Sequence, residues 1–348
     1  MSNFDKHLLT FDQTVKEALN RLNTLEDQLT LFIVDNQNRL VGTLTDGDIR
    51  RSLVNGYTVD SSIKEIMFKE FTFLPEKKFT IGQVLNIKKK KIGLVPIVDD
   101  DLIIKKVINF DKIKSLLPVD AVIMAGGEGR RLRPLTETIP KPLLKIADKP
   151  IIEYNIDRLA QYGIQQMYIS IKYLGHLIEE YFNDGSSRDI SINYLSEDKP
   201  LGTIGALSLV DHFENDYIIV MNSDLLTNID YEDFFMEFIN QGADMAVATI
   251  PYKVDIPYAV VETNNNLVIN FKEKPTYTYY SNAGIYLIKK EIIEFIPKDE
   301  FYNATDLMDK LIKSHKKLIS YPMLNYWLDI GKPEDFKKAQ LDIRHINF

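Results

Sequence analysis

The chain has 348 residues, of which 45% are hydrophobic and 26% are charged, and it contains no cysteine. This length is too great for one ordinary hydrophobic core and indicates two domains, and the lack of cysteine excludes disulfides and thiolate metal sites. The formal net charge of −8 argues against a nucleic-acid partner, because binding to a phosphate backbone requires a basic face. No apolar run is long enough to span a membrane, and the first residues lack the features of a secretory signal. We therefore expect a cytoplasmic globular protein.

A repeat with an offset of 64 residues organises the first third of the chain. The sequence Ile-Val-Asp at positions 33–35 recurs at 97–99, and Ile49 is matched by Ile113. Each copy is expected to contain a helix, two strands and a second helix. One such unit leaves an apolar face uncovered, so the two copies should pack as a pair.

In the first copy, strands are expected at 31–34 and 40–44, and a helix should begin near Thr45. A Thr or Asp at this position would cap the helix and leave backbone N–H groups free at its start. This copy resembles a CBS motif, and residues 1–118 resemble an α+β CBS pair. The resemblance implies that Thr45 and Asp48 hold the phosphate and ribose of a regulatory adenine nucleotide.

The second copy departs from this pattern. At the offset of 64 residues, Asn109 replaces Thr45 and Lys112 replaces Asp48. A carboxylate that would bind ribose has become a cation, so at most one standard site is intact. Two interpretations stay open: the pair senses a nucleotide, or it only dimerises the chain.

The pattern changes after Pro118, where short apolar runs begin to alternate with amphipathic stretches. This alternation predicts a mainly parallel α/β sheet with a Rossmann-like nucleotide-binding half in a second domain, residues 119–348. The predicted strands are 121–124, 167–171, 217–221, 245–250 and 283–288, and the predicted helices are 150–162, 231–241 and 333–344.

A glycine-rich turn follows the first of these strands. Glycines after a buried strand let the backbone approach a ligand and direct N–H groups at phosphate. Arg131 and Lys141 place two cations within the same segment, where they would stabilise the charge of a triphosphate that loses pyrophosphate. The segment is neither a P-loop nor a dinucleotide fingerprint.

The sequence G-G-x-G-x-R-L-x-P-L-T at 126–136, followed by P-K-P-L-L at 140–144, resembles the nucleoside-triphosphate:sugar-1-phosphate transferase family, whose fold is GT-A-like. The resemblance covers residues 119–348 and implies that Arg131 and Lys141 are the phosphate-binding Arg and the catalytic Lys. The usual Thr before that Arg is Arg130 here. The implied nucleotide-binding residues are Ala125, Gly126, Gly127, Gly129, Gly202 and Thr203.

Two carboxylates occur in family contexts further along the chain. Asp224 follows the predicted strand at 217–221, and Asp329 lies in Trp-Leu-Asp-Ile-Gly at 327–331. Strands of a parallel sheet end at the ligand crevice, and Mg²⁺ takes one or two carboxylates together with phosphate oxygens and water. We therefore expect Asp224 and Asp329 to bind Mg²⁺. The resemblance adds four residues expected to contact the sugar phosphate: Glu273, Lys274, Asn282 and Gly284.

The resemblance implies that a nucleoside triphosphate and a sugar-1-phosphate react to form a nucleotide sugar for surface glycans, with GTP favoured and UTP or dTTP as alternatives. Two other interpretations stay open. The second domain is a catalytically silent regulatory subunit, or the chain is mainly a nucleotide sensor. We also expect a homo-oligomer.

Overall fold

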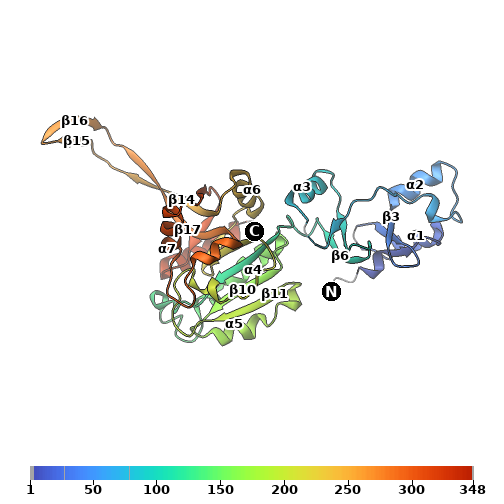
Figure 1. The fold of residues 1–348 in the computed structure, drawn as a ribbon, viewed down its shortest axis with the longest axis horizontal. Helices are drawn as coiled ribbons and strands as arrows, with labels where there is room; N and C mark the ends of the chain where they lie inside the picture. The colour runs from blue at the N-terminus through green and yellow to red at the C-terminus, as the bar shows by residue number, and fades with distance from the viewer. Residues whose placement is uncertain (1–3, 27, 78, 347–348) are drawn as a thin grey trace. The chain divides into compact units, whose positions relative to one another are not determined.

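The computed structural model describes residues 4–26, 28–77 and 79–346, and the chain divides into two compact units, Met1–Pro118 and Val119–Phe348 (Figure 1). The second unit is a mixed α/β structure built on a mainly parallel sheet, so the predicted fold class is confirmed. Among the described residues, no helix has both the length and the apolar character needed to cross a bilayer.

The first unit begins with a three-stranded sheet in the order β1-β2-β3, in which β1 is parallel and β3 antiparallel to β2. Its elements are η1 (Asp5–His7), β1 (Leu8–Thr10), α1 (Val15–Leu22), β2 (Thr30–Val34), β3 (Leu40–Thr45), α2 (Asp46–Val54) and η2 (Ile63–Glu65). Thr14 and Thr45 start α1 and α2 with capping boxes, in which each side chain accepts from the backbone three residues later.

The second repeat forms the sheet β4-β5-β6 with the same strand directions. Its elements are β4 (Leu74–Pro75), α3 (Ile81–Lys89), β5 (Leu94–Val98) and β6 (Ile104–Asn109). The 64-residue offset holds in the strand register, since Leu31 pairs with Leu44 and Val95 pairs with Ile108. A bulge also falls at the equivalent step of both hairpins.

The two repeats pack together as the sequence predicts. Phe32, Val34 and Leu40 of the first sheet share one buried cluster with Leu94 and Val98 of the second. The repeated hydrophobic pattern therefore describes one core built from two similar halves.

The helix expected at the end of the second repeat is absent, which corrects the prediction. After β6 the side chain of Asn109 accepts from the N–H of Asp111 at 2.9 Å, and the N–H of Ile113 reaches the Asn109 carbonyl at 3.3 Å. The chain makes this single turn and then continues without helix to Pro118. Proline disfavours helical backbone in the residue before it. In addition, Asp48 completes the capping box of α2, whereas the equivalent residue of the second repeat is Lys112, whose side chain cannot accept a hydrogen bond.

The second unit contains a seven-stranded sheet in the order β11-β10-β7-β12-β17-β14-β18, in which only β17 runs antiparallel to its neighbours. The strands are β7 (Val119–Met124), β10 (Gln166–Ile171), β11 (Ser191–Ser196), β12 (Tyr217–Asn222), β14 (Met245–Asp255), β17 (Thr276–Lys289) and β18 (Leu318–Pro322). Central residues such as Val122 and Val220 are fully buried.

The helices of this unit are α4 (Ile151–Gln161), α5 (Gly175–Phe182), α6 (Tyr231–Gln241), α7 (Ala304–Lys313) and α8 (Pro333–Asp342). The predicted helices at 150–162, 231–241 and 333–344 correspond to α4, α6 and α8. Two small sheets pair β8 (Lys145–Ile146) with β9 (Lys149–Pro150) and β13 (Leu225–Thr227) with β19 (Trp327–Asp329). The 3-10 turns are η3 (Arg130–Leu132), η4 (Lys141–Leu143), η5 (Ser186–Arg188), η6 (Gly205–Leu209), η7 (Lys290–Phe295) and η8 (Ile343–His345).

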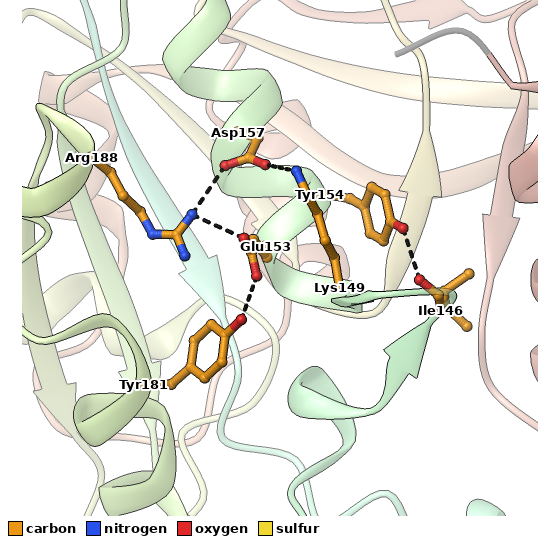
Figure 2. A network of polar contacts seen from close by, with 7 residues as sticks. All are labelled: Ile146, Lys149, Glu153, Tyr154, Asp157, Tyr181 and Arg188. Atoms are coloured by element: carbon orange, nitrogen blue, oxygen red, sulfur yellow. Dashed lines mark hydrogen bonds and ion pairs between the residues drawn. The ribbon is translucent and has the colours of Figure 1, made fainter.

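A polar network fixes α4 against α5 and η5 (Figure 2). Glu153 on α4 accepts from the Tyr181 hydroxyl at 2.7 Å and from Arg188 at 3.0 Å, while Asp157 accepts from Lys149 at 2.6 Å. Because Glu153 is buried, its charge requires these partners. None of the residues in this network lines the cavity described below, and the network has a structural role.

The strands β14 and β17 are much longer than predicted. The sequence predicts strands at 245–250 and 283–288, whereas the two strands continue in register beyond the sheet from Thr249↔Asn282 to Asp255↔Thr276. Beyond them, β15 (Val260–Asn264) and β16 (Leu267–Lys272) close the hairpin. We call residues 251–281 the arm, which projects from the body of this unit (Figure 1).

Candidate active site

A cavity of about 510 Å³ opens where four parallel strands, β7, β10, β11 and β12, end at one edge of the sheet. Ligand crevices of open α/β sheets lie at this edge. The residues that line it are Met124, Ala125, Gly126, Gly127, Glu128, Gly129, Arg130, Lys141, Pro142, Lys172, Glu197, Pro200, Leu201, Gly202, Thr203, Asn222, Ser223, Asp224 and Phe301. All six predicted nucleotide-binding residues are among them.

The glycine-rich turn is shaped by its neighbours. The N–H of Ala125 donates to the Ser170 carbonyl at 2.9 Å, which holds the turn to β10. Gly129 has a φ of +62°, and a Cβ there would lie 3.0 Å from side-chain atoms of both Lys141 and Thr136. A Cβ at Gly127 would meet nothing within 4 Å. The turn therefore presents open backbone to the cavity at Gly127 while Gly129 is packed against Lys141.

Lys141 and Asp224 form an ion pair in the cavity wall. Their side chains are only 12% and 21% exposed, so water screens the pair weakly. The Lys141 ammonium also lies 3.9 Å from Oδ1 of Asp329. One cation thus stands between two carboxylates, and these are the predicted catalytic Lys and the predicted metal ligands.

The small sheet β13–β19 brings the two carboxylates together. Leu225 pairs with Asp329 across it, and the strand register places Asp224 beside Ile330. The Oδ1 atoms of Asp224 and Asp329 are both buried without a hydrogen-bond partner. Burial and the neighbouring Asp224 raise the pKa of Asp329, and Lys141 and Arg131 partly offset this rise.

These carboxylates fit Mg²⁺. Two unsatisfied carboxylate oxygens are ligands of the hard, oxygen type that Mg²⁺ accepts, and the ion normally takes only one or two protein carboxylates. The described residues contain no cluster of three or more acidic, histidine or cysteine side chains that would suit a metal bound by protein ligands alone. A site of this composition needs substrate phosphate and water to complete it.

The two arginines of the turn lie in different surroundings. Arg131 is exposed and is not among the residues that line the cavity; its guanidinium lies over Gly331, where a Cβ would be 3.1 Å from Nη2. Arg130 lines the cavity and forms an ion pair with Glu128 at 2.7 Å. The cation that departs from the family pattern is therefore paired with a neighbouring carboxylate.

The loop with Gly202 and Thr203 is fixed to the start of α7. Gly202 has a φ of +78°, and a Cβ there would lie 2.5 Å from the carbonyl oxygen of Tyr302. The hydroxyl of Thr203 accepts from the N–H of Ala304 at 2.9 Å. This loop forms one wall of the cavity because its glycine lets two backbones meet closely.

The predicted sugar-binding residues are only partly brought together. Gly284, with a φ of +72°, lies against the side chain of Asn222 in the cavity wall. Asn282 accepts from the N–H of Gly284 at 2.8 Å at the root of the arm. Glu273 and Lys274 lie on the arm, exposed, and do not line the cavity of their own chain.

Sequence reasoning did not identify Glu197, Lys172 or Asn222 as cavity residues. Glu197 is buried and accepts from the Ser170 hydroxyl and, at 3.0 Å, from the N–H of Leu201. Glu197 directly follows β11, and a carboxylate at the end of a strand is the sequence feature that could have identified it. Because β11 was not among the predicted strands, Glu197 was not recognised as a cavity residue.

In the first unit, Thr45 and Asp48 contact each other at the start of α2. Asp48 Oδ2 accepts from the Thr45 N–H at 2.9 Å, and Oδ1 accepts from Arg51 at 2.6 Å. Burial opposes ionisation of Asp48, but hydrogen bonds from Thr45 and Arg51 outweigh it and hold the pKa of Asp48 below its ordinary value. Asp48 is therefore an ionised carboxylate already engaged by Arg51.

Parallel strands that end at a glycine turn, with a cavity lysine that faces two carboxylates, define an α/β nucleotide-binding enzyme domain. The family model for nucleotidyl transferases matches residues 120–345, and this chain belongs to that family. The CBS domain model matches residues 7–55, which form the first repeat.

Individual relatives differ in the base that their names specify. D-glycero-alpha-D-manno-heptose 1-phosphate guanylyltransferase of Aneurinibacillus thermoaerophilus is 34% identical over 65% of this chain and 99% of the relative. UTP–glucose-1-phosphate uridylyltransferase of Synechocystis sp. is 33% identical over 63% of this chain, but the match spans only 62% of that relative. HddC from Yersinia pseudotuberculosis, solved with GMP-PN, matches with a TM-score of 0.51 and 28% identity over 65% of this chain and 99% of its own.

Proposed function

We propose that the chain transfers a nucleoside monophosphate from a nucleoside triphosphate to a sugar-1-phosphate and releases pyrophosphate. The observation that carries the proposal is the arrangement of Lys141 between Asp224 and Asp329, next to the glycine turn. A glycine turn suits phosphate, and a buried cation beside two carboxylates suits a reaction in which charge develops on phosphate oxygens.

In the proposed reaction, an oxygen of the sugar-1-phosphate attacks the α-phosphorus, and the bond to pyrophosphate breaks. Backbone N–H groups of the glycine turn orient the triphosphate, and the Lys141 ammonium stabilises its charge. Arg131, whose guanidinium lies over Gly331 outside the cavity lining, would add a second positive charge for the triphosphate. Asp224 and Asp329 would hold Mg²⁺, which neutralises phosphate charge when bound. No covalent enzyme intermediate is required.

We propose GTP as the preferred nucleotide. The support is that the match spans 99% of the guanylyltransferase from Aneurinibacillus and 99% of HddC, which was solved in complex with GMP-PN. A uridylyltransferase of similar identity supports UTP as the second candidate. A silent regulatory subunit is disfavoured because it has no need for Lys141 and Asp224 in the cavity wall with Asp329 beside the same lysine.

The experiment is a panel in which the full chain is given each common nucleoside triphosphate with each of several sugar-1-phosphates, and pyrophosphate release is measured with and without a chelator. We expect release that requires both substrates and is lost with the chelator, with GTP turned over fastest. Faster turnover of UTP or dTTP across several sugar phosphates would reject the base preference but keep the reaction class.

A further inference from the structure

The arm, residues 251–281, is an apolar segment that nothing in its own unit covers (Figure 1). None of its residues is buried, although many of them are large and hydrophobic. Tyr258 is 75% exposed, Leu267 70% and Phe271 66%. A two-stranded ribbon is only marginally stable by itself in water, and a contiguous exposed apolar surface indicates a contact with another molecule.

Both faces of this ribbon are apolar. Leu267, Val268 and Ile269 are consecutive residues of β16, and each is more than half exposed. Tyr279 and Tyr280 are consecutive in β17 and are 60% and 58% exposed. Neighbouring residues of a strand point to opposite faces, so folding the arm back against its own unit would cover one face and leave the other in water. A ribbon held between two chains is covered on both.

The arm begins at the edge of the cavity. Asn282, at its root, binds the N–H of Gly284, and Gly284 touches the side chain of Asn222 in the cavity wall. The ladder from Thr249↔Asn282 to Asp255↔Thr276 is unbroken, and six strand residues span roughly 20 Å. A side chain that lies farther out on the arm than Thr276 is therefore too distant to reach the cavity of its own chain.

Two charged residues, Glu273 and Lys274, lie on this outer part of the arm. In the part of the chain that the structure describes, the side chains of Glu273 and Lys274 form no hydrogen bond or ion pair, and both are exposed. The nearby Lys272, in contrast, pairs with Glu262 at 3.4 Å. An unpaired cation on an extended apolar arm is suited to bind an anion on another surface.

We propose that two copies of the chain exchange arms, so that each arm packs on the partner and presents Lys274 to the partner's cavity. Reciprocal exchange of one element between identical chains gives a closed two-fold dimer. In this arrangement Lys274 contacts the sugar phosphate in trans, a role that rests on the proposed function. The arm contact itself does not depend on that function.

A mixed dimer tests the exchange directly. Chains with Asp224→Asn and chains with Lys274→Ala, carrying different tags, are co-expressed and the mixed dimer is purified. With exchanged arms, one site combines an intact cavity with an intact arm, so about half of the wild-type turnover per dimer should return. With arms used within their own chain, both sites carry a defect and turnover stays at background.

The control reverses these outcomes. A wild-type chain is paired with a chain that carries both Asp224→Asn and Lys274→Ala. Exchange now places a defect in each site and should reduce turnover to background, whereas unexchanged arms leave about half. Background turnover in the first mixed dimer together with half in this control overturns the proposal.

A second experiment does not require any transferase activity. Because the chain has no cysteine, the double variant Gly127→Cys/Lys274→Cys carries one thiol on the turn of the cavity and one on the arm, and a short bismaleimide can join them. We expect a covalent dimer on a denaturing gel. A closed monomer, or no cross-link, contradicts the exchange.

Light scattering completes the test. The wild-type chain should have the mass of two chains, and Ile269→Asp/Phe271→Asp should lower it to one. Ile312→Asp, at an equally exposed position on α7, should leave the mass unchanged. A wild-type monomer, or a dimer insensitive to the arm variant, overturns the proposal even if the chain proves to have another activity.

Discussion

The backbone N–H of Ile330 donates to the carbonyl oxygen of Asp224 at 3.1 Å. This contact continues the ladder of β13 and β19, and it fixes the segment before α8 to the end of β12. As a result Asp224 and Asp329, which are far apart in the sequence, face the same lysine. The position of the two carboxylates is set by backbone pairing and does not depend on a bound ligand.

Asp224→Asn should lower turnover by about 10²-fold or more, which is the scale of losing one preorganised electrostatic contact. The substitution keeps the shape of the side chain but removes the charge that faces Lys141. The melting temperature of the chain should change little. Asp216→Asn, at a side chain that is 84% exposed, serves as the control and should keep full turnover. Near-normal activity of Asp224→Asn would show that the proposed metal ligand is wrongly assigned.

Gly202→Ala should destabilise the protein and reduce turnover, whereas Gly127→Ala should leave the melting temperature unchanged. Gly202 has a φ of +78° and its added Cβ would lie 2.5 Å from a backbone carbonyl, while Gly127 has open space. A side chain at positive φ costs about 1 kcal/mol or more, which corresponds to a decrease of a few degrees. Equal melting temperatures for the two variants would contradict the close contact between this loop and Tyr302.

Asp244 should contribute stability that depends on pH. Burial disfavours its ionised form, but hydrogen bonds from Lys289 and the Lys317 N–H outweigh this and lower the pKa of Asp244. A carboxyl whose pKa is lower in the folded state stabilises the fold above its unfolded pKa, and the contribution is lost as pH falls through the folded pKa.

Asp244→Asn should therefore lower the melting temperature at pH 7 by a few degrees, since hydrogen bonds to charged groups contribute about 1.5–3 kcal/mol. The difference from wild type should persist down to about pH 5 and shrink below about pH 4. Asp216→Asn, which removes an exposed pair with Lys290, should have little effect at any pH. A difference that does not change with pH would exclude this role of the ionised carboxyl.

Asp48→Ala should abolish binding of a nucleotide to the first repeat. The start of α2 offers N–H groups for phosphate. Asp48 offers carboxylate oxygens for ribose once its hydrogen bond from Arg51 is broken. Titration calorimetry of the full chain with AMP should show one binding event that Asp48→Ala removes. Lys112→Ala, the equivalent position in the second repeat, is the control and should keep it. Binding that survives Asp48→Ala places the site elsewhere, and no binding by wild type favours a dimerisation module.

The sequence predicted most of the second unit because its periodicity and its packing agree. The helix predicted at 231–241 is the one observed, since Asp230 caps it and Gly242 ends it in a left-handed conformation. The strand predicted at 217–221 is followed by the carboxylate that lines the cavity. Here each local signal and the buried sheet favour the same structure.

The arm and the second repeat were predicted less well. The tyrosine-rich residues of 276–282 extend β17 without entering a core, so the alternation of buried and exposed residues that marks a strand is missing. The residue that corresponds to Asp48 is Lys112, and the loss of one capping side chain before Pro118 removed a helix that hydrophobic spacing had predicted. In both places the local sequence pattern does not indicate which surface, if any, packs against the segment.

The most direct test of the central claim is product analysis of the wild-type full chain incubated with Mg²⁺, GTP and a set of sugar-1-phosphates, compared with Lys141→Ala. We predict that mass spectrometry finds a nucleoside diphosphate sugar and an equal amount of pyrophosphate for at least one pair of substrates. Lys141→Ala should form both products about 10²-fold more slowly or worse. A wild-type chain that forms no nucleotide sugar from any nucleoside triphosphate, or a Lys141→Ala variant with unchanged rates, would contradict the account.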